Sequence, residues 1–177
     1  TVTGVQTCAL PISTDYTVAP EDVDANISSA QSTATNAATA ATNAQNSANT
    51  ANSAISDMTS DDKITAQEKQ AMKTEWDSIV SEKTKNDTQA DAFSVSRTTY
   101  DSAYSTLSTT IGTNLSNLTT TWDLGSGGGA TLRAKFKAYY DARTDLLNAV
   151  STKAKDLANS AVSTAASNAA SLYVTQS

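Results

Sequence analysis

Six oxygen-bearing positions between residues 57 and 68 have the spacing of a calcium-binding loop of the EF-hand kind. Loop positions 1, 3, 5, 7, 9 and 12 of such a motif fall on Asp57, Thr59, Asp61, Lys63 (through its carbonyl), Thr65 and Glu68. Calcium takes about six to eight oxygen ligands, and these residues could supply them. Against calcium, Asp62 stands where a glycine normally permits the sharp turn. We therefore expect a solvated acidic turn in which Thr65 and Glu68 cap the next helix, with calcium as the alternative.

The residues on which most enzyme mechanisms depend are missing. The chain has no histidine, and its single cysteine, Cys8, lies near the N-terminus. This composition excludes Ser-His-Asp and Cys-His nucleophiles, zinc sites built from His and Cys, and c-type haem attachment. Glu75 and Asp77 are a carboxylate pair in sequence only, because side chains two residues apart on a helix face different ways. We expect neither an enzyme nor a bound cofactor.

The aromatic residues of the central region recur at helical spacing, which is typical of a buried core rather than of a ligand cage. They are Trp76, Tyr100, Tyr104, Phe136, Tyr139 and Tyr140. Arg143 follows Tyr139 and Tyr140 on the same predicted helix. It is expected to stack on those rings or to bridge to Asp101 or Asp145, as a satisfied polar contact rather than a binding group.

All twelve basic residues and most of the acidic residues lie in the middle of the chain. Ala, Thr and Ser make up almost half of the 177 residues, and no Asp, Glu, Lys or Arg occurs in residues 25–56 or 157–177. The net charge of -6 would repel phosphate backbones, so nucleic acid is not an expected partner. No stretch approaches the roughly 18 consecutive apolar residues of a membrane span, so membrane insertion is not expected either.

The first thirteen residues do not read as part of a folded protein. Residues 2–12 look like the in-frame translation of a common sequencing-library adapter. We interpret residues 1–13 as an artefact, so that the chain is a metagenomic fragment of a longer protein. Residues 14–21 are then a linker.

Residues 22–58 carry an unbroken heptad pattern, which predicts an alanine-rich helix. The apolar seam is Val23, Ile27, Ala30, Ala34, Ala37, Ala41, Ala44, Ala48, Ala51, Ile55 and Met58. Ser, Thr and Asn fill the other positions and are poor helix formers, so this helix needs a partner helix. Residues 147–177 predict a second such helix with a weaker seam. That seam is Leu147, Val150, Ala154, Leu157 and Ala161, followed by a one-residue shift to Ala165, Ala169 and Leu172.

Residues 59–146 are predicted to form a helical bundle. Helices are expected at about 65–83, 88–93 and 96–118 and from 131 onward, with Ser96 as an N-cap and Gly112 weakening the third helix. The apolar stripes are Ile64, Met72, Trp76, Ile79 and Val80 on the first helix, and Leu132, Phe136, Tyr139, Tyr140, Arg143, Leu146 and Val150 on the last. The glycine-rich segment 119–129 reads as a flexible connector. The expected fold class is all-α, a small helical bundle flanked by long alanine-rich coiled-coil helices.

A set of motifs runs through the bundle region. The pattern I-T-x-x-E-K, E-W, A-D-x-[YF]-x-V-S, Y-D-x-A-Y-x-x-L and F-x-x-Y-Y-x-x-R-x-x-L-L falls on Ile64, Thr65, Glu68, Lys69, Glu75, Trp76, Ala90, Asp91, Phe93, Val95, Ser96, Tyr100, Asp101, Ala103, Tyr104, Leu107, Phe136, Tyr139, Tyr140, Arg143, Leu146 and Leu147. These stretches, about half of the chain, resemble a helical module in tail-tip, host-specificity and tail-fibre proteins of bacteriophages and prophages. The resemblance implies a virion tail protein, made in the bacterial cytoplasm before assembly, and carries over no catalytic residue.

Three functions from different classes are compatible with these features. The leading one is a structural spacer or scaffold of a tail fibre or tail tip, in contact with other tail chains and forming a homo-oligomer through its coiled-coil arms. The two arms could pair antiparallel as a hairpin stalk or join copies in a parallel trimer, and the sequence does not choose between them. The alternatives are a host-surface adhesin or carbohydrate-binding module that uses exposed aromatics such as Trp122, and a bacterial signalling coiled coil.

Overall fold

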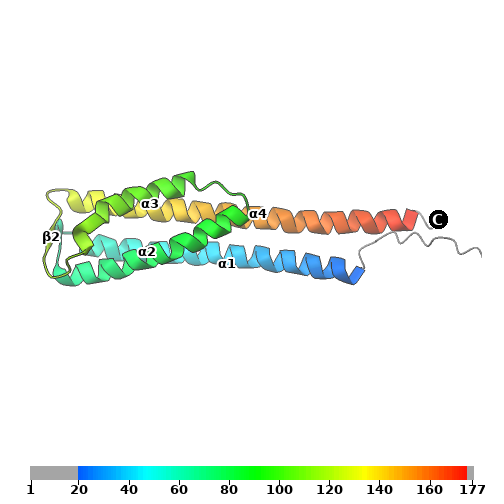
Figure 1. The fold of residues 1–177 in the computed structure, drawn as a ribbon, viewed down its shortest axis with the longest axis horizontal. Helices are drawn as coiled ribbons and strands as arrows, with labels where there is room; N and C mark the ends of the chain where they lie inside the picture. The colour runs from blue at the N-terminus through cyan, green and yellow to red at the C-terminus, as the bar shows by residue number, and fades with distance from the viewer. Residues whose placement is uncertain (1–19, 175–177) are drawn as a thin grey trace, which may run out of the picture.

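Within residues 20–174, which the computed structural model describes, the chain forms four α-helices and one very short β-ladder (Figure 1). The elements are α1 (Pro20–Met58), β1 (Lys63–Ile64), α2 (Ala66–Ala92), α3 (Thr98–Ile111), the 3-10 helix η1 (Gly112–Leu115), β2 (Trp122–Asp123) and α4 (Gly128–Val174). The prediction of an all-α fold is confirmed. None of these helices is both long enough and apolar enough to cross a bilayer. The adapter-like residues 1–13 and residues 14–19 of the predicted linker lie outside the described residues.

The two longest helices, α1 and α4, lie side by side, and α2 and α3 cover one end of the pair (Figure 1). Arg143 of α4 reaches Ala44 in the middle of α1, whereas Arg133, earlier in α4, reaches Thr59 just beyond the end of α1. The two helices are therefore antiparallel. Past the ends of α2 and α3 only α1 and α4 continue, and α1 begins at the end of the molecule where α4 finishes (Figure 1). The partner that α1 requires is α4 of the same chain, which is the hairpin arrangement.

The alanine seam of α1 is the surface that packs against α4. Seven successive seam residues are buried: Ala34, Ala37, Ala41, Ala44, Ala48, Ala51 and Ile55. The seam residues nearer the ends are half-buried: Val23, Ile27, Ala30 and Met58. Alanine lets two helix backbones approach closely but buries little apolar area per residue. The pairing therefore depends on a long run of contacts rather than on a few large ones.

The seam of α4 differs from the predicted one. Leu157 was expected in the seam but is 57% exposed, and the next residue, Ala158, is 5% exposed. The register therefore shifts between Ala154 and Ala158, earlier than predicted. A small residue fits where two backbones lie close together, which explains why the alanine and not the leucine is covered. Of the last predicted seam positions, Ala169 is exposed and the side chain of Leu172 lies outside the described ones.

Helix α2 is continuous where two helices were predicted. No break occurs between Lys83 and Thr88, because this stretch contains neither Gly nor Pro and Lys83 Nζ pairs with Asp87 one turn later at 2.7 Å. Ile79 is buried as predicted, but Val80 is 43% exposed. The next residue along a helix turns by about 100°, so Val80 leaves the face that Ile79 occupies.

The predicted signals at helix ends have mixed outcomes. Thr65 and Glu68 form a complete capping box at the start of α2, as predicted. Gly112 ends α3 with a φ of 40°, a conformation that favours glycine. Ser96 is not the N-cap of α3, because that position belongs to Arg97 and no side chain caps it.

The β-ladder fastens the connection after α1 to the connection before α4. Lys63 lies opposite Asp123 and Ile64 lies opposite Trp122 in antiparallel register. Strands of two residues are too short to show an alternating pattern, which is why no strand was predicted. The ladder closes the end of the molecule that α2 and α3 cover (Figure 1).

Candidate functional site

The six positions of the calcium-like loop are not brought together as a ligand set. Thr59 is buried, and its hydroxyl donates to the Ile55 carbonyl at 2.7 Å. The Asp61 carboxylate accepts the Lys63 N–H at 3.1 Å, and Glu68 accepts the N–H of Thr65 in the capping box. Within residues 20–174 no three acidic, histidine or cysteine side chains gather as a metal site requires. Four of the six positions therefore already use their side-chain oxygens in hydrogen bonds within the chain, namely Thr59, Asp61, Thr65 and Glu68.

Asp62 anchors the start of α4. Its two carboxylate oxygens accept the N–H groups of Gly127 at 2.9 Å and Gly129 at 2.8 Å, and its carbonyl accepts the N–H of Leu124 at 2.9 Å. Asp62 itself has a φ of 59°, so it adopts the backbone conformation for which a calcium loop would use glycine. A carboxylate at a helix N-terminus is stabilised by the free N–H groups and by the helix dipole.

The glycine-rich segment is not the flexible connector that the sequence suggested. Gly128 and Gly129 already belong to α4. A Cβ on Gly129 would lie 2.1 Å from the Thr59 carbonyl oxygen, so the two backbones can approach only if this residue is glycine. Arg133, one turn later, donates to the same Thr59 carbonyl at 3.0 Å and to the Thr59 hydroxyl at 2.9 Å. We call this contact between the α1–β1 turn and the start of α4 the closed-end junction, made by Thr59, Asp62, Gly127, Gly129 and Arg133.

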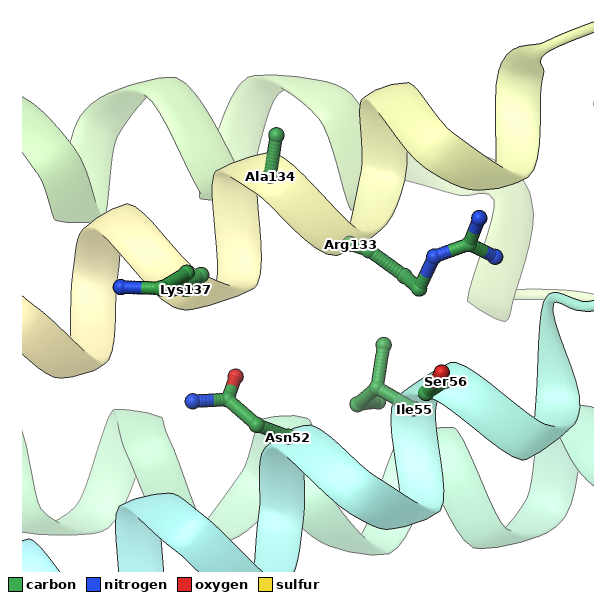
Figure 2. Close-up of a pocket in the computed structure, with 6 residues that line it drawn as sticks. All are labelled: Asn52, Ile55, Ser56, Arg133, Ala134 and Lys137. Atoms are coloured by element: carbon green, nitrogen blue, oxygen red, sulfur yellow. The ribbon is translucent and has the colours of Figure 1, made fainter.

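A shallow groove of about 270 Å³ lies between α1 and α4 next to this junction (Figure 2). Its lining residues are Asn52, Ile55, Ser56, Arg133, Ala134 and Lys137. Both cations of the lining already have partners, because Arg133 donates to Thr59 and Lys137 pairs with Asp141 at 2.6 Å. The lining offers no carboxylate and no nucleophile next to a base.

Arg143 ties α4 to both α1 and α2. Its guanidinium is buried and donates to the Glu82 carboxylate at 2.7 Å, the Ala44 carbonyl at 2.7 Å and the Ser47 hydroxyl at 2.8 Å. It also lies over the Tyr140 ring, 4.9 Å from the ring centre, as predicted. The predicted bridge to Asp101 or Asp145 is wrong, because Glu82 of α2 takes that place.

A chain of hydrogen bonds continues from Glu82 through two buried tyrosines. Tyr139 donates to Glu82 at 2.8 Å, the hydroxyls of Tyr100 and Tyr139 lie 3.2 Å apart, and the Asn86 amide donates to Tyr100 at 3.1 Å. Because the hydroxyl proton of Tyr139 goes to Glu82, Tyr100 must donate to Tyr139. Burial raises the pKa of both phenols, so both hydroxyls stay protonated donors. We call Glu82, Asn86, Tyr100, Tyr139 and Arg143 the central polar cluster.

Glu75 and Asp77 point in different directions, as predicted. Glu75 accepts a hydrogen bond from Tyr140, whose pKa is raised by burial, whereas Asp77 pairs with Lys73 on the surface at 2.7 Å. The two carboxylates therefore have separate partners, which does not favour the paired acid and base of a glycosidase.

Trp122 is not the freely exposed aromatic that an adhesin was expected to use. The residue is half-buried and packs against the hydrophobic core. Its backbone is held in the β-ladder opposite Ile64, which is completely buried. The ring is therefore only partly exposed, because one side of it packs against the core.

The sequence did contain a signal for the central polar cluster. Residues at core spacing along α2 are Met72, Glu75, Ile79, Glu82, Asn86 and Ala90. Three of these are polar, and a polar residue at a core position requires a buried partner. Apolar periodicity alone does not reveal Glu82 and Asn86, because both are polar residues at core positions.

Comparison with known proteins finds a relative among phage tail proteins. The "Tail fiber protein" of Enterococcus phage phiEF24C is 39% identical over 111 residues, which are 63% of this chain. The chain spans only 6% of the length of that protein. No protein-family model matches the chain, and no solved structure matches it. The identity supports the relation to phage tail proteins that the motifs suggested.

Replacing Gly129 by alanine tests the closed-end junction. In an ordinary helix this change would stabilise by up to about 1 kcal/mol, but here the new methyl group meets the Thr59 carbonyl. We expect the free energy of unfolding, measured by urea denaturation, to fall by about 2 kcal/mol or more. Ala130→Ser at the exposed neighbouring position is the control and should change little. A Gly129→Ala protein that is more stable than the unaltered chain would contradict the close approach of residue 129 to the Thr59 carbonyl.

Arg143→Met tests the central polar cluster. The change removes the cation paired with Glu82 and the donor to the Ala44 carbonyl, while Tyr139 still donates to Glu82, so we expect a loss of about 3 kcal/mol in the free energy of unfolding. Lys137→Met is the matched control, because its ion pair with Asp141 is mostly exposed and should cost less than about 0.5 kcal/mol. Equal losses of stability in the two variants would show that Arg143 does not stabilise the contact of α4 with α1 and α2.

Lowering the pH tests Asp62. The N–H groups of Gly127 and Gly129 hold the pKa of Asp62 below its ordinary value of 3.8. Its contribution to stability is therefore present above about pH 4 and is lost as the pH falls through the lowered pKa. We expect Asp62→Asn to lose less stability than the unaltered chain between about pH 5 and pH 2, measured by urea denaturation. Asp61→Asn is the control, and an Asp62→Asn protein as acid-sensitive as this control would count against the anchor.

Proposed function

We propose that this chain is a structural, non-catalytic part of a phage tail fibre, in which α1 and α4 form a hairpin stalk that carries the helical bundle at its closed end. The observation that carries the proposal is the antiparallel pairing of α1 with α4 inside one chain, together with the identity to a tail fiber protein. The chain would be a piece of a longer protein, located in the virion tail and in contact with other tail chains.

The described side chains support a mechanical rather than a chemical role. The two buried cations of the described residues, Arg143 and Lys69, donate to partners of the same chain: Arg143 to Glu82 and Ala44, and Lys69 to the Asn117 carbonyl at 3.0 Å. The central polar cluster crosses from α1 through α4 to α2 and α3. Buried polar contacts of this kind fix one register between packed helices, which is what a load-carrying element needs.

The hairpin geometry favours a scaffold that projects from the fibre over a spacer that lengthens it. An in-line spacer takes the chain in at one end and releases it at the other. Here α1 begins and α4 finishes at the same end of the molecule (Figure 1). In a longer chain the bundle would stand away from the point where the chain enters and leaves.

Deleting the hairpin from an assembled fibre tests the proposal. Residues 20–174 would be replaced by a short Gly/Ser linker in the fibre gene that encodes them. We expect fibres of unchanged length in negative-stain electron microscopy, with a lateral projection lost. An in-line spacer would instead shorten each fibre by roughly the 58 Å length of α1.

The control for this deletion is a small folded tag inserted at Ser126, an exposed residue in the loop before α4. The tag should add density beside the fibre axis and leave the fibre length unaltered. Density on the axis, or a shortened deletion fibre, would contradict the projecting hairpin.

A further inference from the structure

Two different kinds of contact hold α1 against α4. In the bundle, large side chains such as Tyr100 and Tyr139 are completely buried, and Arg143 donates to both α1 and α2. Past the ends of α2 and α3, only α1 and α4 continue (Figure 1). We call this part, residues 22–40 of α1 with residues 151–170 of α4, the two-helix arm. Its open end is the one where α1 begins and α4 finishes.

The side chains buried in the two-helix arm are all small. They are Ala34, Ala37, Ser151, Ala154 and Ala158. The larger residues of the arm are less covered: Val23 and Ile27 are half-buried, and Leu157 is 57% exposed. Because an alanine removes little apolar area from water, each turn of the arm gains less free energy from burial than a turn of the bundle, where tyrosine and phenylalanine are buried.

Among the described residues of the arm, no polar contact between α1 and α4 makes up for this small burial. Each side-chain hydrogen bond there stays within one helix and runs to the carbonyl one turn earlier. The donors are Thr33, Thr35, Thr39, Thr152 and Ser167. The nearest hydrogen bonds that join α1 to α4 are those of Arg143, to the Ala44 carbonyl at 2.7 Å and to the Ser47 hydroxyl at 2.8 Å.

The charged residues of the arm have no opposite charge across from them. Helix α4 carries three charged residues there, the exposed Lys153, Lys155 and Asp156, but residues 25–56 of α1 contain no charge. The acidic start of α1 lies towards the far end of α4, and residues 157–177 are also uncharged. The antiparallel arrangement therefore places each charged stretch opposite an uncharged one, and no ion pair strengthens the arm.

The two helices of the arm have little helix stability of their own. Many positions outside the seam are Ser, Thr or Asn, which are poor helix formers. Short helices of such composition are unstable alone in water, because nucleation is costly and tertiary packing supplies most helix stability. Separation of the two helices therefore frees chain. The residues of the arm, extended at about 3.5 Å each, would add roughly 130 Å of length.

The arm meets tension at its open end. In the proposed tail fibre, on which this step rests, the chain enters and leaves the hairpin there. A pull on two antiparallel helices from the same end loads the contacts nearest that end first, so they break one after another instead of all together. Separation that proceeds inward next meets Arg143, whose buried guanidinium holds the Ala44 carbonyl of α1 and Glu82 of α2.

We propose that the two-helix arm is an extensible segment, closed at rest, that separates from its open end under tension and closes again afterwards. Arg143 and the bundle stop the separation. The hairpin then has two parts of different stability, as proteins with locally opening segments do. The arm lengthens the chain under load, while the bundle keeps its fold and keeps the register between α1 and α4.

Stretching the full chain by its two termini in optical tweezers tests the proposal. We expect a gradual lengthening at low force that reverses on relaxation and adds roughly 130 Å of contour length. An abrupt step at higher force should follow, when the bundle unfolds. Separation of the arm and unfolding of the bundle in a single all-or-none step would overturn the proposal.

Two alanine-to-glycine variants assign the two transitions. Ala37 in the arm and Ala48 in the bundle-covered part of α1 are both seam residues and both 3% exposed. Ala37→Gly should raise the equilibrium constant for opening of the arm roughly fivefold at a given force, because glycine is less favourable than alanine in a helix by about that factor. It should leave the abrupt step unchanged. Ala48→Gly should lower the force of the abrupt step and leave the gradual lengthening unchanged, and equal effects of both variants on the gradual lengthening would contradict the proposal.

Hydrogen exchange of the unstretched chain gives a second readout. The N–H groups of the arm should exchange at least about tenfold faster than the slowest N–H groups of α2, because the arm opens without the bundle. Ala48→Gly should speed exchange of those α2 groups roughly fivefold and leave exchange in the arm unchanged. Circular dichroism checks that each variant keeps its helix content. The same increase in both places would show that the chain opens only as a whole and would overturn the extensible arm. Such a chain could still project from the fibre, so the deletion experiment on fibre length and this one can fail separately.

Discussion

The close antiparallel approach of α1 and α4 is the constraint on which the rest of the structure depends. Alanine at the seam positions from Ala30 to Ala51 permits that approach, but the contact buries little area and the residues at the other positions of α1 are poor helix formers. Hydrogen bonds between α1 and α4 also stabilise the pair, and they form only because the two helix backbones are close together. The guanidinium of Arg143 reaches the Ala44 carbonyl at 2.7 Å, and the start of α4 touches the Thr59 carbonyl where glycine leaves room.

Polar contacts restrain the paired helices at the closed-end junction and at the central polar cluster, and each has a distinct physical basis. At the closed-end junction, the Asp62 carboxylate accepts hydrogen bonds from the N–H groups of Gly127 and Gly129 at the start of α4. In the middle, Glu82 accepts from both Arg143 and Tyr139 and so joins α2 to α4. Both places restrict how the helices can slide past one another. A rigid hairpin with a fixed register follows from these contacts.

Much of the fold is predictable from local patterns in the sequence, and what is not predictable depends on contacts between distant residues. Heptad spacing, the Thr65–Glu68 capping box and the buried aromatic stripe of α4 are all local patterns, and all three are found in the structure. Leu157 looked like a seam residue because its spacing fits, but the distance between two backbones decided that Ala158 packs there. Asp62 read as a defect in a calcium loop because its partners, Gly127 and Gly129, lie more than sixty residues away.

The pairing of α1 with α4 inside one chain can be measured directly by double electron–electron resonance. Spin labels would replace the exposed Thr39 and Asn148 in a Cys8→Ser chain, with a large excess of unlabelled chain to dilute contacts between copies. Helices packed about 8–10 Å apart predict a narrow distance distribution at roughly 20–30 Å that persists on dilution. A short distance that disappears on dilution, or a broad distribution beyond about 50 Å, would contradict the hairpin.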